Sequence, residues 1–188
     1  MIKNKQQSLA AFTILELLVA MAIISILIAM GLRVFGTVQE KARDNRRKQD
    51  LQSITKALEM YYNDLGRYPL SSTPDGFILG CGVDAQQGCA WGGVFRNNTN
   101  GTLYMGEIPQ DPSVGTRYFY QAVDDGAGFY LFAHLENEED REVALNTGGE
   151  PSTFLNTSCI QQSDLWTADS CNYVIMSSNL TDLPAVVQ

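Results

Sequence analysis

The sequence has a single histidine, His134, and none of the short motifs that accompany common enzyme chemistries. It contains no glycine-rich nucleotide loop, no GxSxG nucleophile motif and no HExxH metal motif. His134 falls within an expected strand, where packing or surface exposure explains it better than a role as a general base. Asp111, between Pro109 and Pro112, is typical of a turn rather than of a catalytic acid. We therefore do not expect an enzyme.

Basic residues are scarce in the second part of the chain. Residues 64–188 carry four basic and sixteen acidic side chains, whereas residues 12–63 carry seven basic and five acidic ones. A strongly acidic segment repels nucleic-acid phosphates, so we expect no direct nucleic-acid partner for it. The opposite charges of the two segments could instead guide contacts between copies of the chain.

Cysteine is also rare, and its four residues lie after position 80: Cys81, Cys89, Cys159 and Cys171. Four cysteines allow three disulfide connectivities. We favour the two local pairs, Cys81 with Cys89 and Cys159 with Cys171, since each would close a loop that contains glycine or serine. Such disulfides would form in an oxidising compartment. Zinc is the alternative, but the spacings differ from those of CxxC knuckles and His134 is distant in sequence.

Proline is absent before Pro69, and charge is nearly absent from Phe12 to Leu32. This apolar run contains one charged side chain, Glu16, and follows a short leader with two lysines. A helix of that length spans about 30 Å, the thickness of the hydrocarbon core of a bilayer. A carboxylate inside such a span is costly and usually has a partner or a function. A new amine at Phe12, created by cleavage after Ala11, would be a natural partner for Glu16.

The leader, the small residue Ala11 and the run Phe12-Thr13-Ile14-Leu15-Glu16 resemble the class III signal of type IV prepilins and type II secretion pseudopilins. The resemblance implies that a prepilin peptidase cleaves between Ala11 and Phe12 and methylates the new Phe12 amine. It also implies that Glu16 pairs with the N-terminus of a neighbouring subunit during filament assembly. The family usually has glycine at the position of Ala11. Many members have proline where this chain has Arg33, so the resemblance leaves open where the helix bends.

Two simpler interpretations of the apolar segment stay open. The small residues Ala29 and Gly31 fit the −3 and −1 positions of an ordinary secretory signal peptide. The segment could also be an uncleaved signal anchor. Glu16 would be incidental in both cases. Against the signal peptide, a charge fits poorly in its apolar region and the helical pattern continues past Gly31.

The residues that follow predict a continuation of the same helix to about Leu65. Residues 39–50 are polar nearly all round, which fits either a solvated face with pairs such as Arg46–Asp50 or a basic cluster on anionic lipid or neighbouring subunits. A stripe at helical spacing then predicts packing on a core: Leu51, Ile54, Ala57, Leu58, Tyr61 and Tyr62. Gly66 and Pro69 end the helix. Residues 58–69 also resemble the helix exit of pilins and major pseudopilins.

Strand signals are concentrated in two aromatic-rich runs, 115–123 and 129–136. They flank a glycine-rich turn and predict a β-hairpin. One face of the second run suits the helix stripe: Phe129, Leu131, Ala133 and Leu135. Residues 103–136 resemble the heads of major pseudopilins and short-headed pilins, and residues 172–176 predict a last strand.

Residues 70–101 are rich in glycine, serine, asparagine and aspartate and predict an irregular loop. We interpret this loop as a disulfide-closed insertion with Trp91 facing inwards. A subunit interface or an adhesive surface is the alternative.

The acidic run 136–142 contains hard oxygen ligands of the kind that calcium prefers. Related pseudopilins have a calcium site in their C-terminal loops, so Glu138, Glu139 and Asp140 are candidate ligands. The run lacks the ligand spacing of a defined calcium loop, and such runs are commonly solvated surface. We expect no other metal or cofactor.

These patterns predict an α+β fold in which one long helix packs by its second half on a small antiparallel sheet. Four segments follow from them: a cleaved leader (1–11), a transmembrane and filament-core helix (12–35), its amphipathic continuation (36–66) and a head (67–188) with two disulfide-bounded loop regions. The resemblance implies a structural subunit, and we favour a pilin of a type IV pilus-like filament. The alternatives are a type II secretion pseudopilin and a minor tip pilin that acts as an adhesin or DNA receptor.

The implied partners are further copies of the chain in a helical filament, the prepilin peptidase and the assembly machinery of a pilus or secretion system. The chain would cross the inner membrane once before assembly. It would then belong to an extracellular pilus or to a periplasmic pseudopilus.

Overall fold

The structure is a computed structural model that describes residues 13–81, 88–97, 100–162 and 165–188, apart from the side chains of residues 30–34 and 162. The chain divides into two compact units, the first ending at Gln39 and the second starting at Glu40. The cleavage site predicted between Ala11 and Phe12 lies outside the described residues.

In the first unit, the described residues belong to the beginning of helix α1 (Ile14–Leu65). Its large apolar side chains are exposed, from Ile14 at 85% to Val38 at 55%. Within the described part of the chain, no helix combines the length and the apolar character that crossing a membrane requires. Phe12 and the side chains of residues 30–34, which belong to the expected span 12–35, lie outside that part.

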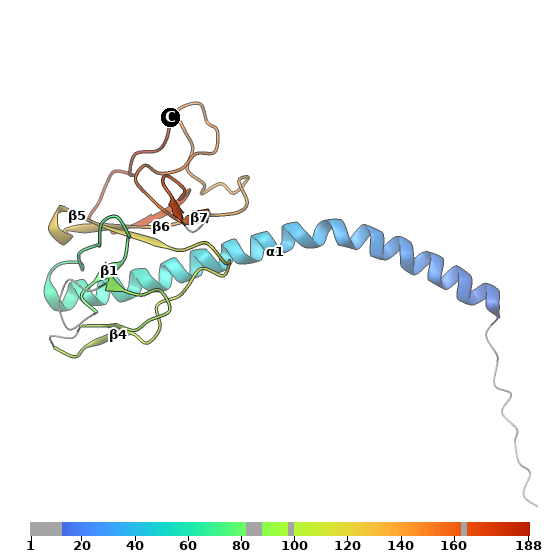
Figure 1. The fold of residues 1–188 in the computed structure, drawn as a ribbon, viewed down its shortest axis with the longest axis horizontal. Coiled ribbons are helices and arrows are strands. Elements are labelled where there is room, and N and C mark those ends of the chain that lie inside the picture. The colour runs from blue at the N-terminus through green and yellow to red at the C-terminus, as the bar shows by residue number, and fades with distance from the viewer. Residues whose placement is uncertain (1–12, 82–87, 98–99, 163–164) are drawn as a thin grey trace, which may run out of the picture. The chain divides into compact units, whose positions relative to one another are not determined.

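The second unit is built on a three-stranded antiparallel sheet in the order β5-β6-β9 (Figure 1). The strands are β5 (Phe119–Val123), β6 (Gly128–Ala133) and β9 (Tyr173–Met176). Phe119 lies opposite Phe132, and Tyr130 lies opposite Met176. The predicted hairpin and last strand are therefore present, and the α+β fold is confirmed.

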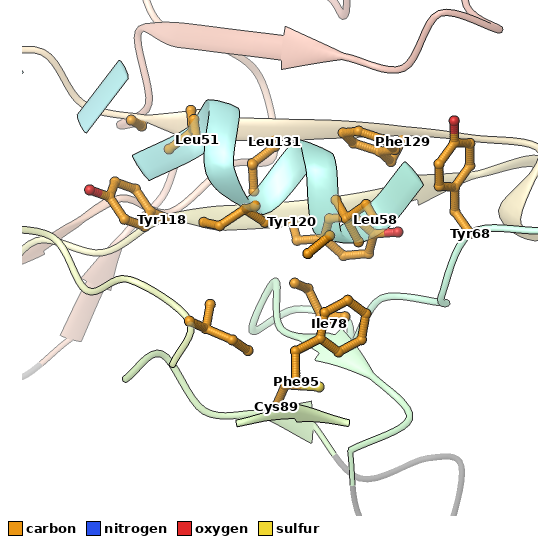
Figure 2. Close-up of a cluster of buried hydrophobic side chains, with 14 of the residues drawn as sticks. Leu51, Leu58, Tyr68, Ile78, Cys89, Phe95, Tyr118, Tyr120, Phe129 and Leu131 are labelled. Carbon is orange, nitrogen blue, oxygen red and sulfur yellow. The ribbon is translucent and has the colours of Figure 1, made fainter. Parts of the chain in front are cut away.

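The central strand β6 is covered on both faces. On one face, Phe129 and Leu131 are fully buried in the same cluster as Leu51 and Leu58 of α1 (Figure 2). This is the contact that the helix stripe predicts. On the other face, Phe132 belongs to a second cluster, with Phe119, Phe154, Cys159 and Cys171. This second cluster was not predicted from the sequence.

The end of α1 is tied to the hairpin turn. Gly66 adopts φ +72° and donates its backbone N–H to the carbonyl of Tyr62 at 2.8 Å, as expected for a helix cap. Two residues later, the N–H of Tyr68 donates to the carbonyl of Gly126 at 2.8 Å, in the turn η1 (Asp124–Gly126). Gly126 has φ +89°, and a Cβ there would lie 2.5 Å from the Tyr68 oxygen. This close approach explains the glycine.

Three short antiparallel pairs complete the second unit. They are β1 (Ile78–Leu79) with β2 (Gly88–Cys89), β3 (Phe95–Arg96) with β4 (Leu103–Met105), and β7 (Ile160–Gln162) with β8 (Leu165–Thr167). Residues 70–101 thus contain short strands inside the region predicted to be an irregular loop. Trp91 packs inwards, and its ring meets that of Tyr118 edge-on at 5.8 Å.

Candidate functional site

Glu16 takes part in the first turn of α1. Its Oε2 accepts hydrogen bonds from the backbone N–H and the hydroxyl of Thr13, both at 3.1 Å. The Glu16 N–H in turn donates to the Thr13 hydroxyl at 3.2 Å. This reciprocal pair is a capping box, which gives Glu16 a local role that the sequence analysis missed. The Thr-x-x-Glu spacing of residues 13–16 would have predicted it.

A second polar site joins α1 to the loops of the second unit. Arg47 lies at its centre, with a fully buried side chain. Its guanidinium donates to Asp44 at 2.6 Å, to Asp111 at 2.8 Å and to Glu136 at 2.7 Å. Asp44 also accepts the backbone N–H groups of Glu136 and Asn137, at 3.0 and 2.9 Å. We call Asp44, Arg47, Asp111 and Glu136 the Arg47 network.

The Arg47 network shows that part of the polar stretch 39–50 is buried, beside the solvated face that the sequence allows. Asp44 and Arg47 are only 2% and 0% exposed, because this face of the helix lies against the loops. The predicted pair of Arg46 with Asp50 is present at 3.9 Å, on the exposed side. The basic side chains divide between the two sides, so residues 39–50 do not form a uniform basic surface for lipid.

Asp111 forms a turn, as predicted, and also holds the network. Its carboxylate accepts hydrogen bonds from the N–H of Ser113 at 2.9 Å and from the hydroxyl of Thr116. The same carboxylate receives two nitrogens of Arg47, at 2.8 and 3.0 Å. Its side chain is fully buried and hydrogen-bonded, a structural rather than a catalytic arrangement.

The acidic run 136–142 pairs with basic residues of α1. Arg43 binds Glu136 through two nitrogens, and Lys48 binds Asp140 and Glu142. Of the three calcium candidates, Asp140 is therefore engaged by a cation, whereas Glu138 and Glu139 are exposed. The described residues contain no group of three or more acidic, histidine or cysteine side chains placed to hold a metal ion.

The pairing of Glu136 makes the free energy of unfolding depend on pH. The hydrogen bond from Arg43, supported by bonds from Arg47 and Ser113, lowers the pKa of Glu136 from 4.5 to about 2. A carboxyl group with a lowered pKa stabilises the fold fully above its unfolded pKa, and this contribution is lost as the pH falls towards the folded value.

Urea unfolding of the full chain in detergent, repeated at several pH values, measures this contribution. We expect the wild-type chain to lose about 1–2 kcal/mol of unfolding free energy between pH 4.5 and about 2. The loss is limited to this size because a quarter of the Glu136 side chain is exposed and solvent screens the pair. The variant Glu136→Gln should lack that part of the acid dependence. If the wild-type chain and the variant lost stability in parallel, Glu136 would not be its source.

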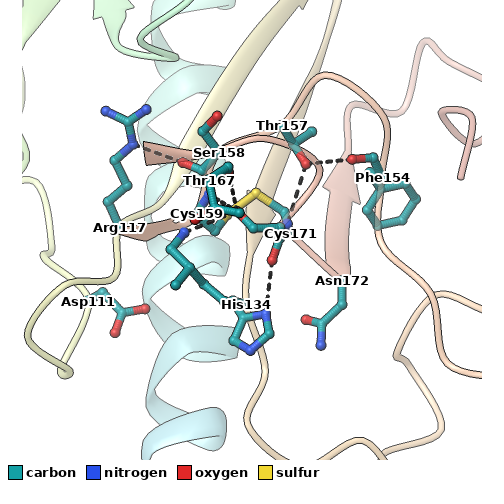
Figure 3. Close-up of a disulfide and its surroundings, with 12 residues drawn as sticks. Asp111, Arg117, His134, Phe154, Thr157, Ser158, Cys159, Thr167, Cys171 and Asn172 are labelled. Atoms are coloured by element: carbon teal, nitrogen blue, oxygen red, sulfur yellow. Dashed lines mark hydrogen bonds between the residues drawn. A yellow bond between two sulfur atoms is a disulfide. The ribbon is translucent and has the colours of Figure 1, made fainter. Parts of the chain in front are cut away.

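His134 lies one residue after β6, and its Nδ1 is 2.9 Å from the carbonyl oxygen of Ser170 (Figure 3). Burial lowers the pKa of the imidazole, which favours the neutral form. The neighbouring Leu135 N–H donates to Asn172 at 2.6 Å, and the Asn172 amide donates back to the Leu135 carbonyl. His134 therefore belongs to the packing at the end of the sheet.

Both disulfides join the pairs that the sequence analysis favours. Cys81 is bonded to Cys89, and Cys159 to Cys171, each with the two Cα atoms 5.1 Å apart. Cys159 and Cys171, whose bridge is drawn in Figure 3, are fully buried in the second cluster, on the face of the sheet that carries Phe132. The second bridge therefore also contributes to the core.

The sequence was compared with protein families and with known proteins. The family model described as "Type II secretion system (T2SS), protein G" matches residues 33–138, more than half of the chain. The chain belongs to the type II secretion system protein G family. The type II secretion system core protein G of Pseudomonas aeruginosa is 28% identical over 131 residues, which cover 70% of this chain and 84% of that protein. No solved structure matches.

Membership of the protein G family confirms the predicted relationship to pseudopilins, which belong to the type IV pilin-like superfamily. It also confirms the expectation of a structural protein rather than an enzyme. It favours the secretion pseudopilin, our alternative interpretation, over the pilus subunit that we preferred. The matched residues end at 138. Strands β7 to β9 and the second disulfide therefore lie beyond the matched region.

Proposed function

We propose that this chain is the major subunit of a periplasmic pseudopilus in a type II secretion system. The observation that carries the proposal is the protein G family match over residues 33–138, which spans part of α1 and the hairpin β5–β6. The curated relative is named a core protein of that system, which agrees with a main structural subunit. The partners are further copies of the chain and the assembly machinery of the secretion system.

Assembly begins at the inner membrane, which the chain crosses once through residues 12–35. A prepilin peptidase cleaves between Ala11 and Phe12 and methylates the new amine. Bundling of the 12–38 segments then buries the exposed apolar side chains between Ile14 and Val38. Because lipid tails are as apolar as these side chains, the bundle is stabilised by close packing and polar contacts between helices rather than by removal of apolar surface from water.

Glu16 sets the register between neighbouring subunits. Its Oε2 is occupied by Thr13 in the capping box. No described residue donates a hydrogen bond to its Oε1, which leaves this oxygen for the N-terminal amine of a neighbour. One carboxylate would thus cap its own helix and neutralise a positive charge that is otherwise buried in the bundle.

Mass spectrometry of the mature protein from its native host tests the processing step. A chain that begins at N-methylated Phe12 would support the proposal. A chain that begins at Leu32 would identify an ordinary secreted protein, and one that begins at Met1 an uncleaved anchor. Either of these results would overturn the assembly pathway. Subunit counting in isolated filaments tests the major role, because a major subunit dominates the filament and a tip subunit does not.

Replacing Glu16 with glutamine should leave membrane insertion intact and reduce filament assembly about tenfold or more, because a charged hydrogen bond between subunits is lost. The matched control is Ser25→Ala in the same helix. The Ser25 hydroxyl donates to the Met21 carbonyl of its own chain at 2.7 Å, so assembly should be unchanged. Crosslinked filaments and secreted protein are counted for both variants. Normal filaments from Glu16→Gln would refute the role of this charge.

A further inference from the structure

A cavity of about 410 Å³ lies beside the loop 110–117. Its walls come from separate parts of the chain and include three aromatic residues, Phe77, Trp91 and Trp166. The two tryptophans of the protein both line this cavity. Val114 stands at its edge with a fully exposed side chain.

The cavity contains a buried cation, Arg117. Its side chain is stacked on Trp166, with the guanidinium carbon 3.8 Å from the ring centroid, and the residue is only 7% exposed. The Nε atom donates to the carbonyl of Ser158 at 2.9 Å (Figure 3). Among the residues that the structure describes, no carboxylate lies within ion-pair distance of the guanidinium, and no acceptor meets its two terminal nitrogens.

A buried guanidinium normally has an anionic partner, because removing its charge from water is costly. Burial lowers the pKa of Arg117, and Asp75 offsets this only through a longer-range charge interaction. Asp111 also lines the cavity, but its carboxylate is fully buried and is already bound by Arg47, Ser113 and Thr116. The charge left without a partner in this cavity is therefore positive.

Trp91, another lining residue, carries a buried polar group. Within the described part of the chain, the indole nitrogen of Trp91 is the one buried side-chain nitrogen or oxygen without a hydrogen-bond partner. Natural proteins leave few such groups, and each calls for an explanation. The terminal nitrogens of Arg117 are not among these buried atoms, so they are accessible to a ligand in the cavity, whose volume lies within the range of small-ligand sites.

We propose that this cavity binds a carboxylate that is attached to an aromatic or aliphatic group. The carboxylate accepts hydrogen bonds from the terminal nitrogens of Arg117, and the apolar part packs against Phe77 and Trp166. Such a group can belong to a free small acid or to an acidic side chain on a second copy of this chain. The site is independent of the proposed filament function.

Intrinsic tryptophan fluorescence tests the site directly, since both tryptophans line it. The full chain is solubilised in detergent and titrated with 3-phenylpropionate. Its neutral analogue, 3-phenylpropanamide, serves as the control probe because it has the same apolar body without the charge. We expect a saturable change with the acid and affinity for the amide that is lower by about tenfold.

Two variants assign the response to the cavity. Arg117→Gln should lower the affinity for 3-phenylpropionate by about tenfold or more. Val114→Glu places a negative charge at the fully exposed edge, where it should repel the acid without disturbing packing. The matched control Leu183→Glu changes an exposed leucine outside the cavity and should bind as the wild-type chain does. Circular dichroism checks that each variant is folded, and Val114→Glu tests the site even if Arg117→Gln does not fold.

A saturable response to the acid that Val114→Glu weakens and Leu183→Glu preserves would establish the site. No response, an equal response to acid and amide, or equal binding by all folded variants would overturn it and leave Arg117 a packing residue.

Dilution of the wild-type chain without probe then identifies whether the natural carboxylate comes from a free acid or from a second copy of the chain. A spectrum that changes with protein concentration, and does not change in Val114→Glu, assigns the carboxylate to a second copy. A constant spectrum in a chain that binds the acid assigns it to a free ligand.

Discussion

Replacing Arg47 with methionine should destabilise the second unit by about 3–5 kcal/mol, the cost of removing one partner from a buried ion pair. Methionine preserves much of the side-chain length but leaves the Asp44 and Asp111 carboxylates buried beside it without a cation. Glu136 keeps its contact with Arg43, so it contributes less to the loss. The free energy of unfolding, measured by urea titration of the full chain in detergent, gives the size of the effect.

Arg46→Met is the matched control, because the two arginines are adjacent and the substitution is the same. The side chain of Arg46 is 68% exposed, and its nitrogen lies 3.9 Å from Asp50. Exposed pairs of this kind contribute about 0–1 kcal/mol, so the control should lose little stability. Similar losses in the two variants would show that the Arg47 network does not hold α1 to the loops.

The contrast between Arg46 and Arg47 also explains what could not be predicted from the sequence. Both residues lie in one polar stretch, and local sequence offers no sign that only one is buried. The partners of Arg47 on the loops are 64 and 89 residues away along the chain. Periodicity identifies an apolar face but not a polar residue that meets distant acids, so we predicted a solvated or lipid-facing surface.

Other features could be predicted because their signals are local. The helix stripe and the aromatic hairpin follow from spacing alone, and the structure packs Leu51 and Leu58 against Phe129 and Leu131 as expected. The capping box of Thr13 and Glu16 is also local, because Thr-x-x-Glu is its sequence pattern. The same glutamate can therefore cap its own helix and take part in contacts between subunits.

Burial of the second face of the sheet could likewise be predicted from the residues of β6. Residues 128–133, Gly-Phe-Tyr-Leu-Phe-Ala, are apolar on both faces, whereas a half-exposed strand would alternate with polar residues. Such a run indicates that something covers each side. The helix covers one side, and Phe154 and the Cys159–Cys171 disulfide cover the other. This cover lies beyond the residues that match the protein G family model.

The two disulfides should therefore contribute unequally to stability. In the chain-entropy view, closing loops of 8 and 12 residues stabilises the folded chain by similar amounts, about 2.5–3 kcal/mol each. Cys159 and Cys171 are fully buried against Phe132, so removing their sulfur atoms also leaves a cavity. Cys81 is partly exposed. We expect the double variant Cys159→Ala, Cys171→Ala to lose about 4 kcal/mol.

The matched variant Cys81→Ala, Cys89→Ala removes the other bridge by the same chemistry and should lose about 3 kcal/mol, because Cys89 is buried but Cys81 is partly exposed, so less buried volume is removed than at the second bridge. Urea unfolding of both variants measures the two losses, and hydrogen exchange at the β6 amides locates them. Faster exchange in β6 is expected only when the Cys159–Cys171 bridge is absent, because that bridge belongs to the cover of the strand. Equal losses with unchanged exchange in β6 would mean that the second bridge closes a surface loop and that the far face of the sheet is held by Phe154 alone.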